Sequence, residues 1–215
     1  MPPLITLLCL AHALEGVPAT GKSPAEFAPK GWAVESELTA ELNGDALPDR
    51  VVVLLQVAHG DDERHRALLW LHGTKDGGFE LIDSNVGLLA PLNGLGMKGG
   101  TAEPELELNK NVLNVSNWGG SADSYGSTHR FRFEKGVVRL IGVDKSNMNT
   151  LTMEESGTST NLVTGASESY WNPPQDDGTG QPTGKKGWKK KTKVAVGAPQ
   201  RLRDVVEYDR DAPVR

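Results

Sequence analysis

The run at positions 51–57, which reads VVVLLQV, constrains the fold more than any other part of this sequence. β-branched residues favour strands, and a run that is apolar without alternation is typical of a strand buried on both faces. An acid-rich stretch directly precedes it. The run therefore predicts a central strand that is fed by a polar loop.

Turn-forming residues indicate many short strands. The chain has 25 Gly and 13 Pro among 215 residues, a content that favours short strands over long helices. Strand-like runs recur at 67–72, 79–82, 105–108, 112–115, 128–133 and 137–142. Because short turns join consecutive runs, we predict a mainly β domain over 29–172, an antiparallel meander that forms a curled sheet or a β-sandwich with little helix.

The acid-rich stretch alternates oxygen-bearing side chains. Glu41, Asn43, Asp45 and Asp49 occupy positions 1, 3, 5 and 9 of a nine-residue loop. Hard cations such as Ca²⁺ select oxygen ligands in this alternation, and the backbone carbonyl of Leu47 adds one more. We therefore predict a Ca²⁺ site at these five residues, with water completing the shell. The alternative is a plain polar turn, because turns select Asn, Gly and Asp.

A second stretch, 117–125, mixes aromatic and small polar residues. Trp118 and Tyr125 offer rigid contact area, and the small residues between them allow close approach of a partner. We predict partner binding by Trp118, Ser121, Asp123 and Tyr125. The alternative is a strand-end loop in which Trp118 caps the core.

Signatures of catalysis are weak. Two His and three acids within 59–65 are residue types that ligate transition metals, but this composition is also typical of a solvated connection between strands. The sequence has no Gly-x-Ser-x-Gly motif and no phosphate-binding glycine pattern followed by a helix. A triad of Ser121, His129 and an acid, assembled only in three dimensions, stays open. We expect that the protein is not an enzyme.

Residues 1–13 have the pattern of an export signal. Positions 4–10 are almost purely apolar, and a small-x-small motif follows them. Cleavage of this signal peptide would remove Cys9, the only cysteine, and would leave no transmembrane span. A buried N-terminal strand or helix is the alternative. We predict a flexible lead-in over 14–28 and a periplasmic or secreted protein.

Charge is unevenly distributed along the chain. The net charge is −5, yet residues 181–215 carry ten Lys or Arg against four Asp or Glu, which leaves 13 basic against 24 acidic residues in 1–180. An acidic body argues against nucleic-acid binding, which needs a basic face. We predict a flexible loop over 173–186, a basic edge strand and C-terminal turn over 187–208, and a frayed tail over 209–215.

Several short motifs occur in an order that resembles a known family. They are Pro29-Lys30-Gly31-Trp32, Leu42-Asn43-Gly44-Asp45, Asp49-Arg50-Val51-Val52-Val53, Gly119-Gly120-Ser121, Phe131-Arg132-Phe133, Leu140-Ile141-Gly142-Val143-Asp144 and Ser159-Thr160-Asn161-Leu162-Val163-Thr164-Gly165. This order is similar to that of exported bacterial proteins, often lipoproteins and often uncharacterised, in which an FG-GAP or VCBS-like acidic loop leads into an all-β domain. The resemblance implies export and an all-β fold. The family pattern has Asp and Gly where this chain has Glu41 and Ala46.

These features predict a non-catalytic exported binding module of the bacterial envelope. Its acidic loop is expected to be stabilised by Ca²⁺, and its partner to be an envelope protein or a glycan. A second hypothesis is an inhibitor or immunity protein that blocks a periplasmic hydrolase, with the stretch 118–125 as its plug. A third is a hydrolase whose site forms only in three dimensions.

Overall fold

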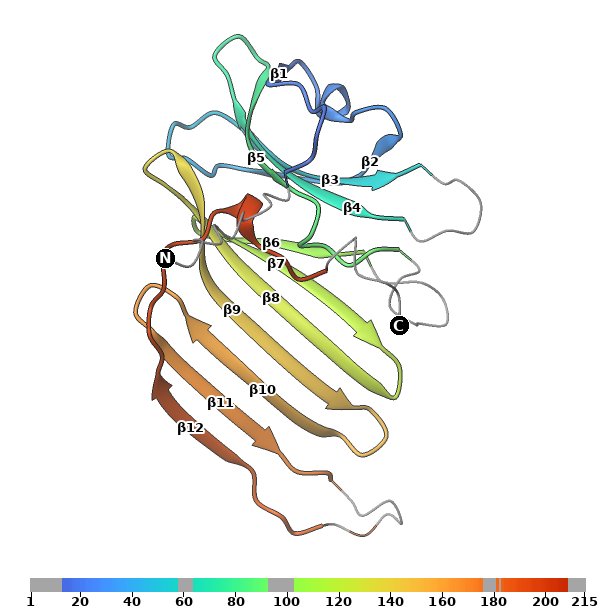
Figure 1. Ribbon diagram of the computed structural model, residues 1–215, viewed down its shortest axis with the longest axis vertical. Coiled ribbons are helices and arrows are strands. Elements are labelled where there is room, and N and C mark those ends of the chain that lie inside the picture. The colour runs from blue at the N-terminus through green and yellow to red at the C-terminus, as the bar shows by residue number, and fades with distance from the viewer. Residues whose placement is uncertain (1–12, 58–63, 93–102, 176–180, 182, 209–215) are drawn as a thin grey trace, which may run out of the picture.

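The computed structural model describes residues 13–57, 64–92, 103–175, 181 and 183–208, which form two antiparallel sheets (Figure 1). The small sheet has the order β1-β5-β4-β3-β2, with β1 (Thr20–Gly21), β2 (Trp32–Ala40), β3 (Asp49–Gln56), β4 (Arg66–Gly73) and β5 (Phe79–Asn85). The large sheet has the order β12-β11-β10-β9-β8-β7-β6, with β6 (Glu105–Asn109), β7 (Val112–Gly120), β8 (Asp123–Glu134), β9 (Val137–Asn149), β10 (Glu154–Asn161), β11 (Ala166–Asn172) and β12 (Trp188–Lys193).

The predicted fold class is confirmed. The protein is mainly β, its sheets are antiparallel, and one of them curls strongly into a half-barrel. Helical structure in the described residues is limited to two short 3-10 turns, η1 (Pro24–Phe27) and η2 (Leu202–Asp204). Nowhere in the described part of the chain is there a helix long and apolar enough to cross a membrane.

Strand β3 explains why the run 51–57 does not alternate. Val51 and Val53 face a core that is shared with the large sheet, whereas Val52 and Leu54 face a second cluster on the other side of the small sheet. All four side chains are fully buried. Since β2 and β4 pair with β3 on its two edges, the prediction of a central strand buried on both faces is confirmed for residues 51–54, whereas Val57 lies beyond the end of β3 and is 49% exposed.

The segment 14–28, predicted as a flexible lead-in, is instead packed against the small sheet. The backbone N–H of Leu14 donates to Oγ of Ser84 at 3.0 Å, and β1 pairs with β5. Phe27 in η1 is fully buried in the second cluster. This segment therefore covers the face of the small sheet that is turned away from the large one.

The large sheet is a meander of hairpins. Tight turns join β6 to β7 and β8 to β9, as predicted, and Lys110, Lys135 and Gly136 in these turns have positive φ. The long strands β8 and β9 carry the sheet well beyond the small sheet (Figure 1). None of the residues in β10, β11 and β12 is buried. The buried core therefore lies at the β6–β9 end.

After β12, which lies at the edge of the sheet, the chain returns to the core as a C-terminal strap, residues 196–208. Leu202 and Val205 of the strap are buried in the shared core. The Nδ2 atom of Asn85 donates to the carbonyl oxygens of Leu202 at 2.6 Å and Val205 at 2.8 Å. The strap thus joins the two sheets.

Candidate functional site

The acidic loop between β2 and β3 is held by its own side chains. Oε1 of Glu41 accepts the backbone N–H groups of Asn43 at 3.1 Å and Gly44 at 2.6 Å. Oδ1 of Asn43 accepts the N–H of Asp45 at 2.9 Å, and Oδ1 of Asp45 accepts that of Leu47 at 2.8 Å. The bond from Leu47 is the main cause that lowers the pKa of Asp45. The side chains that the sequence assigns to a cation therefore already form a polar turn.

Asp49 ties the loop to the sheet. Its carboxylate is fully buried, and its two oxygens accept the N–H of Leu42 and the N–H of Gly73, each at 2.8 Å. Position 73 requires glycine, because a Cβ there would lie 2.6 Å from the carbonyl oxygen of Pro48. Asp49 is therefore a structural brace between the loop and β4.

Calcium binding by this loop stays a prediction. Within the described ranges, no group of three or more His, Cys, Asp or Glu is arranged to hold a metal ion. Glu41 and Asp45 are exposed whereas Asp49 is buried, so the five predicted ligands are not equally accessible. A carboxylate oxygen that accepts one hydrogen bond keeps a further lone pair, which leaves the loop the capacity to bind a cation.

The two predicted partner-binding aromatic residues lie on opposite faces of the large sheet. Trp118 stands opposite Gly126, and Tyr125 stands opposite Gly119 in the adjacent pair, so their side chains alternate. The Trp118 ring lies over Gly126, where a Cβ would be 2.5 Å from a ring atom, and its side chain is 51% exposed. Trp118 and Tyr125 therefore do not share one contact surface, and Trp118 does not cap the core.

Ser121 and Asp123 lie at the end of the β7–β8 hairpin. Nδ2 of Asn149 donates to Oδ1 of Asp123 at 2.7 Å. His129 lies six residues beyond Asp123 in β8, which corresponds to about 20 Å along an extended strand. The structure therefore does not bring Ser121 next to His129, as a catalytic triad of these residues requires.

Only the end of the cluster 59–65 is described. There, the backbone N–H of His65 donates to Oε1 of Gln56 at 3.2 Å. The rest of this cluster lies outside the described residues, as do positions 1–12 of the predicted signal peptide and the predicted tail 209–215.

One face of the large sheet carries a row of aromatic and polar side chains. We call it the inner face, because it also carries the shared core. Five residues stand opposite one another across β8 to β12, namely Tyr125, Asn147, Ser156, Trp171 and Trp188. Directly opposed residues project from the same face of a sheet. These five residues form what we call the aromatic row.

Charged side chains of opposite sign flank the aromatic row. Two positions nearer the β7–β8 turn, Asp123, Asn149 and Glu154 stand opposite one another on the inner face. On the other side of the aromatic row, two residues further along each strand, the next row of opposed residues includes Lys145 and Lys190. The aromatic row therefore has carboxylate acceptors along one side and ammonium donors along the other.

A shallow hollow of about 220 Å³ lies beside the row. Asn147 and Ser156 of the aromatic row line it, together with Asp123, Met148, Asn149 and Glu154. All of these side chains except that of Met148 carry oxygen atoms that accept hydrogen bonds. The hollow is therefore suited to a polar group with several hydrogen-bonding positions.

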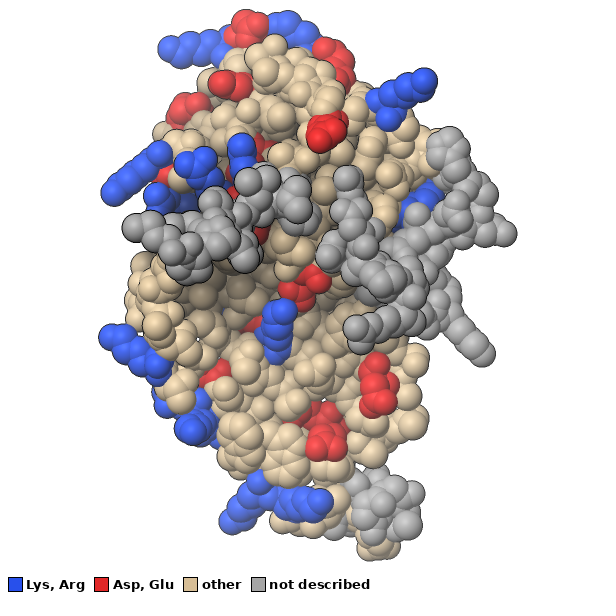
Figure 2. Space-filling view, viewed as in Figure 1, with Lys and Arg blue, Asp and Glu red and all other residues tan. Residues whose placement is uncertain are grey.

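The two tryptophans form the open end of the row. Nε1 of Trp171 donates to Oε1 of Glu154 at 2.7 Å, which fixes this ring beside the hollow. Trp188 in β12 is 50% exposed. Lysine and arginine side chains gather along the margin where β12 lies (Figure 2). The open end thus combines rigid aromatic surface with nearby positive charge.

The C-terminal strap crosses the other end of the row. Glu207 accepts a hydrogen bond from Nζ of Lys145 at 3.0 Å and lies 3.5 Å from Nε2 of His129. Burial lowers the pKa of His129, although Glu207 opposes this shift. Burial also raises the pKa of Tyr125, and Glu207 adds to that shift. The strap therefore packs near Tyr125, and the tryptophan end stays accessible.

No protein-family model, no curated protein and no solved structure matches this chain. The resemblance to exported FG-GAP or VCBS-like proteins therefore stays a prediction.

Of the aromatic row, only Tyr125 was predicted from the sequence, and the other four residues were missed. They lie on four further strands, and their alignment depends on a register that is set by pairing. A signal was present, because Trp171 and Trp188 lie in polar stretches with no apolar alternation. A tryptophan in such a strand has no core to enter, which favours a contact role.

Proposed function

We propose that the protein is a non-catalytic, exported binding module that holds a glycan of the bacterial envelope along its aromatic row. The observation that carries this proposal is the row itself, in which rings at both ends flank amide and hydroxyl groups on one face. Aromatic rings supply apolar faces, and a few convergent polar groups orient a ligand. A sugar chain presents C–H faces and hydroxyl groups, so it matches both kinds of side chain.

The length of the row favours an oligosaccharide over a single sugar. Neighbouring strands lie about 4.8 Å apart, so the five strands from Tyr125 to Trp188 span about 19 Å along the sheet. Because the strap packs near Tyr125, the ligand is expected to extend from the hollow at Asn147 towards Trp188. This path has room for several sugar units.

The flanking charges favour a neutral or zwitterionic glycan over a polyanion. Asp123 and Glu154 accept hydrogen bonds from hydroxyl, amide or ammonium groups, and they repel anions. Lys190 on the other side donates hydrogen bonds to hydroxyl, carbonyl or carboxylate oxygens. A sugar that bears amide groups meets both requirements.

The proposal includes Ca²⁺ as a stabiliser of the acidic loop. It is supported by the alternation of oxygen-bearing side chains and by the exposure of Glu41 and Asp45. This loop belongs to the small sheet, whereas the aromatic row spans β8 to β12. A bound ion would therefore stabilise the fold rather than contact the glycan.

Titration of the full chain with chitohexaose and maltohexaose, followed by calorimetry, tests glycan binding. Trp171→Ala and Trp188→Ala are each expected to weaken binding about tenfold or more, as expected when a ring at the centre of a contact is removed. Trp118→Ala is the matched control, because Trp118 lies on the opposite face and is about as exposed as Trp188. This control is expected to leave the affinity unchanged.

Two results would overturn the proposal. One is the absence of saturable binding to these oligosaccharides and to solubilised envelope glycan. The other is a loss of binding in Trp118→Ala that equals the loss in Trp171→Ala, which would show that the aromatic row is not the glycan site. Cell fractionation tests the predicted export separately, and recovery of the intact chain in the cytoplasm would contradict it.

A further inference from the structure

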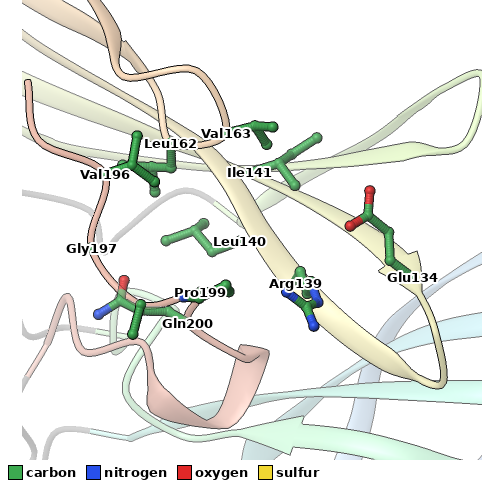
Figure 3. A pocket seen from close by; sticks show the side chains of 11 residues that line it. Glu134, Arg139, Leu140, Ile141, Leu162, Val163, Val196, Gly197, Pro199 and Gln200 are labelled. Atoms are coloured by element: carbon green, nitrogen blue, oxygen red, sulfur yellow. The ribbon is translucent and has the colours of Figure 1, made fainter. Parts of the chain in front are cut away.

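A groove lies along the edge of β9, at the point where β10 ends. β10 pairs with β9 only from Gly142 onward, so residues 137–141 have no partner from β10. The strap takes this edge instead, and the backbone N–H of Leu140 donates to the carbonyl oxygen of Gln200 at 3.0 Å. The strap and the turn between β10 and β11 border the groove (Figure 3).

The groove has the size and composition of a small-ligand site. Its volume is about 540 Å³, which lies within the usual range for such sites. Its apolar lining includes Leu140, Ile141, Leu162, Val163, Val196 and Pro199. Figure 3 shows Glu134 and Arg139 towards one end and Leu162, Val163 and Val196 towards the other. An apolar trough with charged groups at one end suits an amphipathic ligand.

Arg139 is the unexplained polar group of this groove. Its Nε atom is buried and has no hydrogen-bond partner. A buried donor without an acceptor costs free energy, so such a group in a folded protein needs an explanation. The group that would satisfy it is an acceptor, and the guanidinium charge favours an anionic one.

Arg139 is also the middle member of a row of three arginines. It stands opposite Arg132 in β8 and opposite Arg201 in the strap, so the three side chains project from one face. Glu134 pairs with Arg132, whereas neither Arg139 nor Arg201 forms an ion pair with any described residue. Like charges that stand opposite one another destabilise a sheet. An anion bound at this row would relieve that repulsion.

We propose that the groove binds a small amphipathic anion. Its carboxylate or phosphate group accepts paired hydrogen bonds from Arg139, which stands next to the charge of Arg201. Its apolar chain lies along the aliphatic lining of the groove. This site is independent of the proposed glycan site, because Arg132 alternates with the inner-face residue Phe131 and so projects from the opposite face.

Calorimetric titration of the full chain with sodium decanoate and with decyl phosphate tests this site. Arg139→Gln is expected to weaken binding about tenfold or more, because it removes a charged, paired hydrogen-bond donor. Lys30→Gln is the matched control, since it removes the same charge from an exposed residue near the small sheet. Equal affinity in wild type and Arg139→Gln would overturn the proposal, as would the absence of saturable binding of both ligands.

The anion can be a free amphiphile or the headgroup of a lipid, and vesicles separate these sources. Flotation with phosphatidylglycerol vesicles is compared with phosphatidylcholine vesicles. Binding to the anionic vesicles that is lost in Arg139→Gln but kept in Lys30→Gln supports the site with a lipid headgroup as its anion. Decanoate binding without vesicle binding supports it with a free amphiphile. Identical behaviour of both variants in both assays contradicts it.

Two further variants distinguish binding from a folding defect. Val163→Trp adds bulk at the apolar end from an exposed position and keeps Arg139, so it is expected to weaken decanoate binding about tenfold. Arg139→Met removes the unpaired donor and the central like charge, so it is expected to raise the Tm of the ligand-free protein by about 2–4 °C. A lower Tm for Arg139→Met would show that the arginine stabilises the ligand-free fold, which contradicts the free-energy cost of the unpaired Nε from which the anion site is inferred.

Discussion

The small sheet and the strands β10 to β12 are stabilised in different ways. Seven of the eight residues of β4 are buried, whereas none of the residues in β10, β11 and β12 is. Burial of apolar surface on both faces dominates in the first region. The second region depends on strand pairing and on polar cross-strand contacts, such as Tyr170 Oη to Oε1 of Glu155 at 2.8 Å.

This difference separates stability from recognition. In the small sheet, two clusters of buried apolar side chains cover the faces, so most of its apolar side chains stabilise the fold. The strands β10 to β12 can carry exposed tryptophans, lysines and carboxylates because the core does not depend on them. Side chains at the tryptophan end of the aromatic row can therefore be changed with little effect on folding.

The largest expected effect concerns the core of the small sheet. Leu69→Ala removes a fully buried side chain and should lower the free energy of unfolding by about 3 kcal/mol. Trp188→Ala removes a larger but half-exposed side chain and should change the free energy of unfolding by less than about 0.5 kcal/mol. Urea denaturation measures both. Similar losses in the two variants would show that β12 belongs to the cooperative core of the fold.

The next effect concerns the buried brace between the acidic loop and β4. Asp49→Ala leaves the N–H groups of Leu42 and Gly73 without their acceptor and should lower the free energy of unfolding by about 2 kcal/mol. Asp45→Ala in the same loop is the control, because it changes an exposed carboxylate and should lower the free energy of unfolding much less. Denaturation in calcium-free buffer compares them. An equal loss of stability in the two variants would mean that the exposed part of the loop stabilises the fold as much as its buried anchor does.

Calcium should act on the same loop with a smaller effect. A cation at tenfold excess over its Kd stabilises the folded state by about 1.4 kcal/mol, which corresponds to a rise in Tm of about 3–6 °C. Asp45→Asn should abolish this rise, because it replaces one of the predicted ligands by a neutral amide. Thermal unfolding with CaCl₂ and with EGTA measures it. A wild-type Tm that is the same in both buffers would show that the loop is a polar turn without an ion.

Acidification should produce the smallest effect, and it involves both sheets. Burial lowers the pKa of His72 in β4 and of His129 in β8 below the ordinary value of 6.5. Nε2 of His72 accepts a hydrogen bond from Nε1 of Trp70 at 3.1 Å, which a proton on that nitrogen would break. The unfolded chain therefore binds these protons more readily, so stability is present above pH 6.5 and is lost as the pH falls below it.

Thermal unfolding between pH 7.5 and 5 measures this loss. His72→Gln and His129→Gln should each reduce the dependence on pH, and the partly exposed His65 provides the control variant His65→Gln. A larger reduction of the pH dependence of Tm in His72→Gln than in His129→Gln would assign the effect mainly to the small sheet. A Tm that rises on acidification would contradict the neutral state of both imidazoles.

The elements that were predicted correctly have local signals. The continuous apolar run of β3 and the turns before β7 and β9 depend on residues that are near one another in the chain. Strands β10 and β11 were not predicted, because their Ser, Thr, Glu and Gly residues show no apolar alternation. Their strand structure follows from pairing with β9 and with each other.

The candidate sites, too, could be predicted only where their residues are near one another in the chain. The acidic loop was identified because its residues are contiguous, although its side chains turn out to bond its own backbone. Trp118 and Tyr125 were grouped because they are near in sequence, yet alternation places them on opposite faces. Arg132 and Arg139 lie on the two strands of a predicted hairpin, but their pairing depends on its register, and Arg201 is 62 residues beyond Arg139 in the chain.

By itself, the sequence determined a chain of short antiparallel strands with one strand buried on both faces, because hydrophobic pattern and turn chemistry are local properties. Only the tertiary structure decided which side chains share a face, and so produced the aromatic row on one side of the large sheet and the arginine row on the other. The physical reason is strand register, since a shift of one residue moves every side chain to the opposite face.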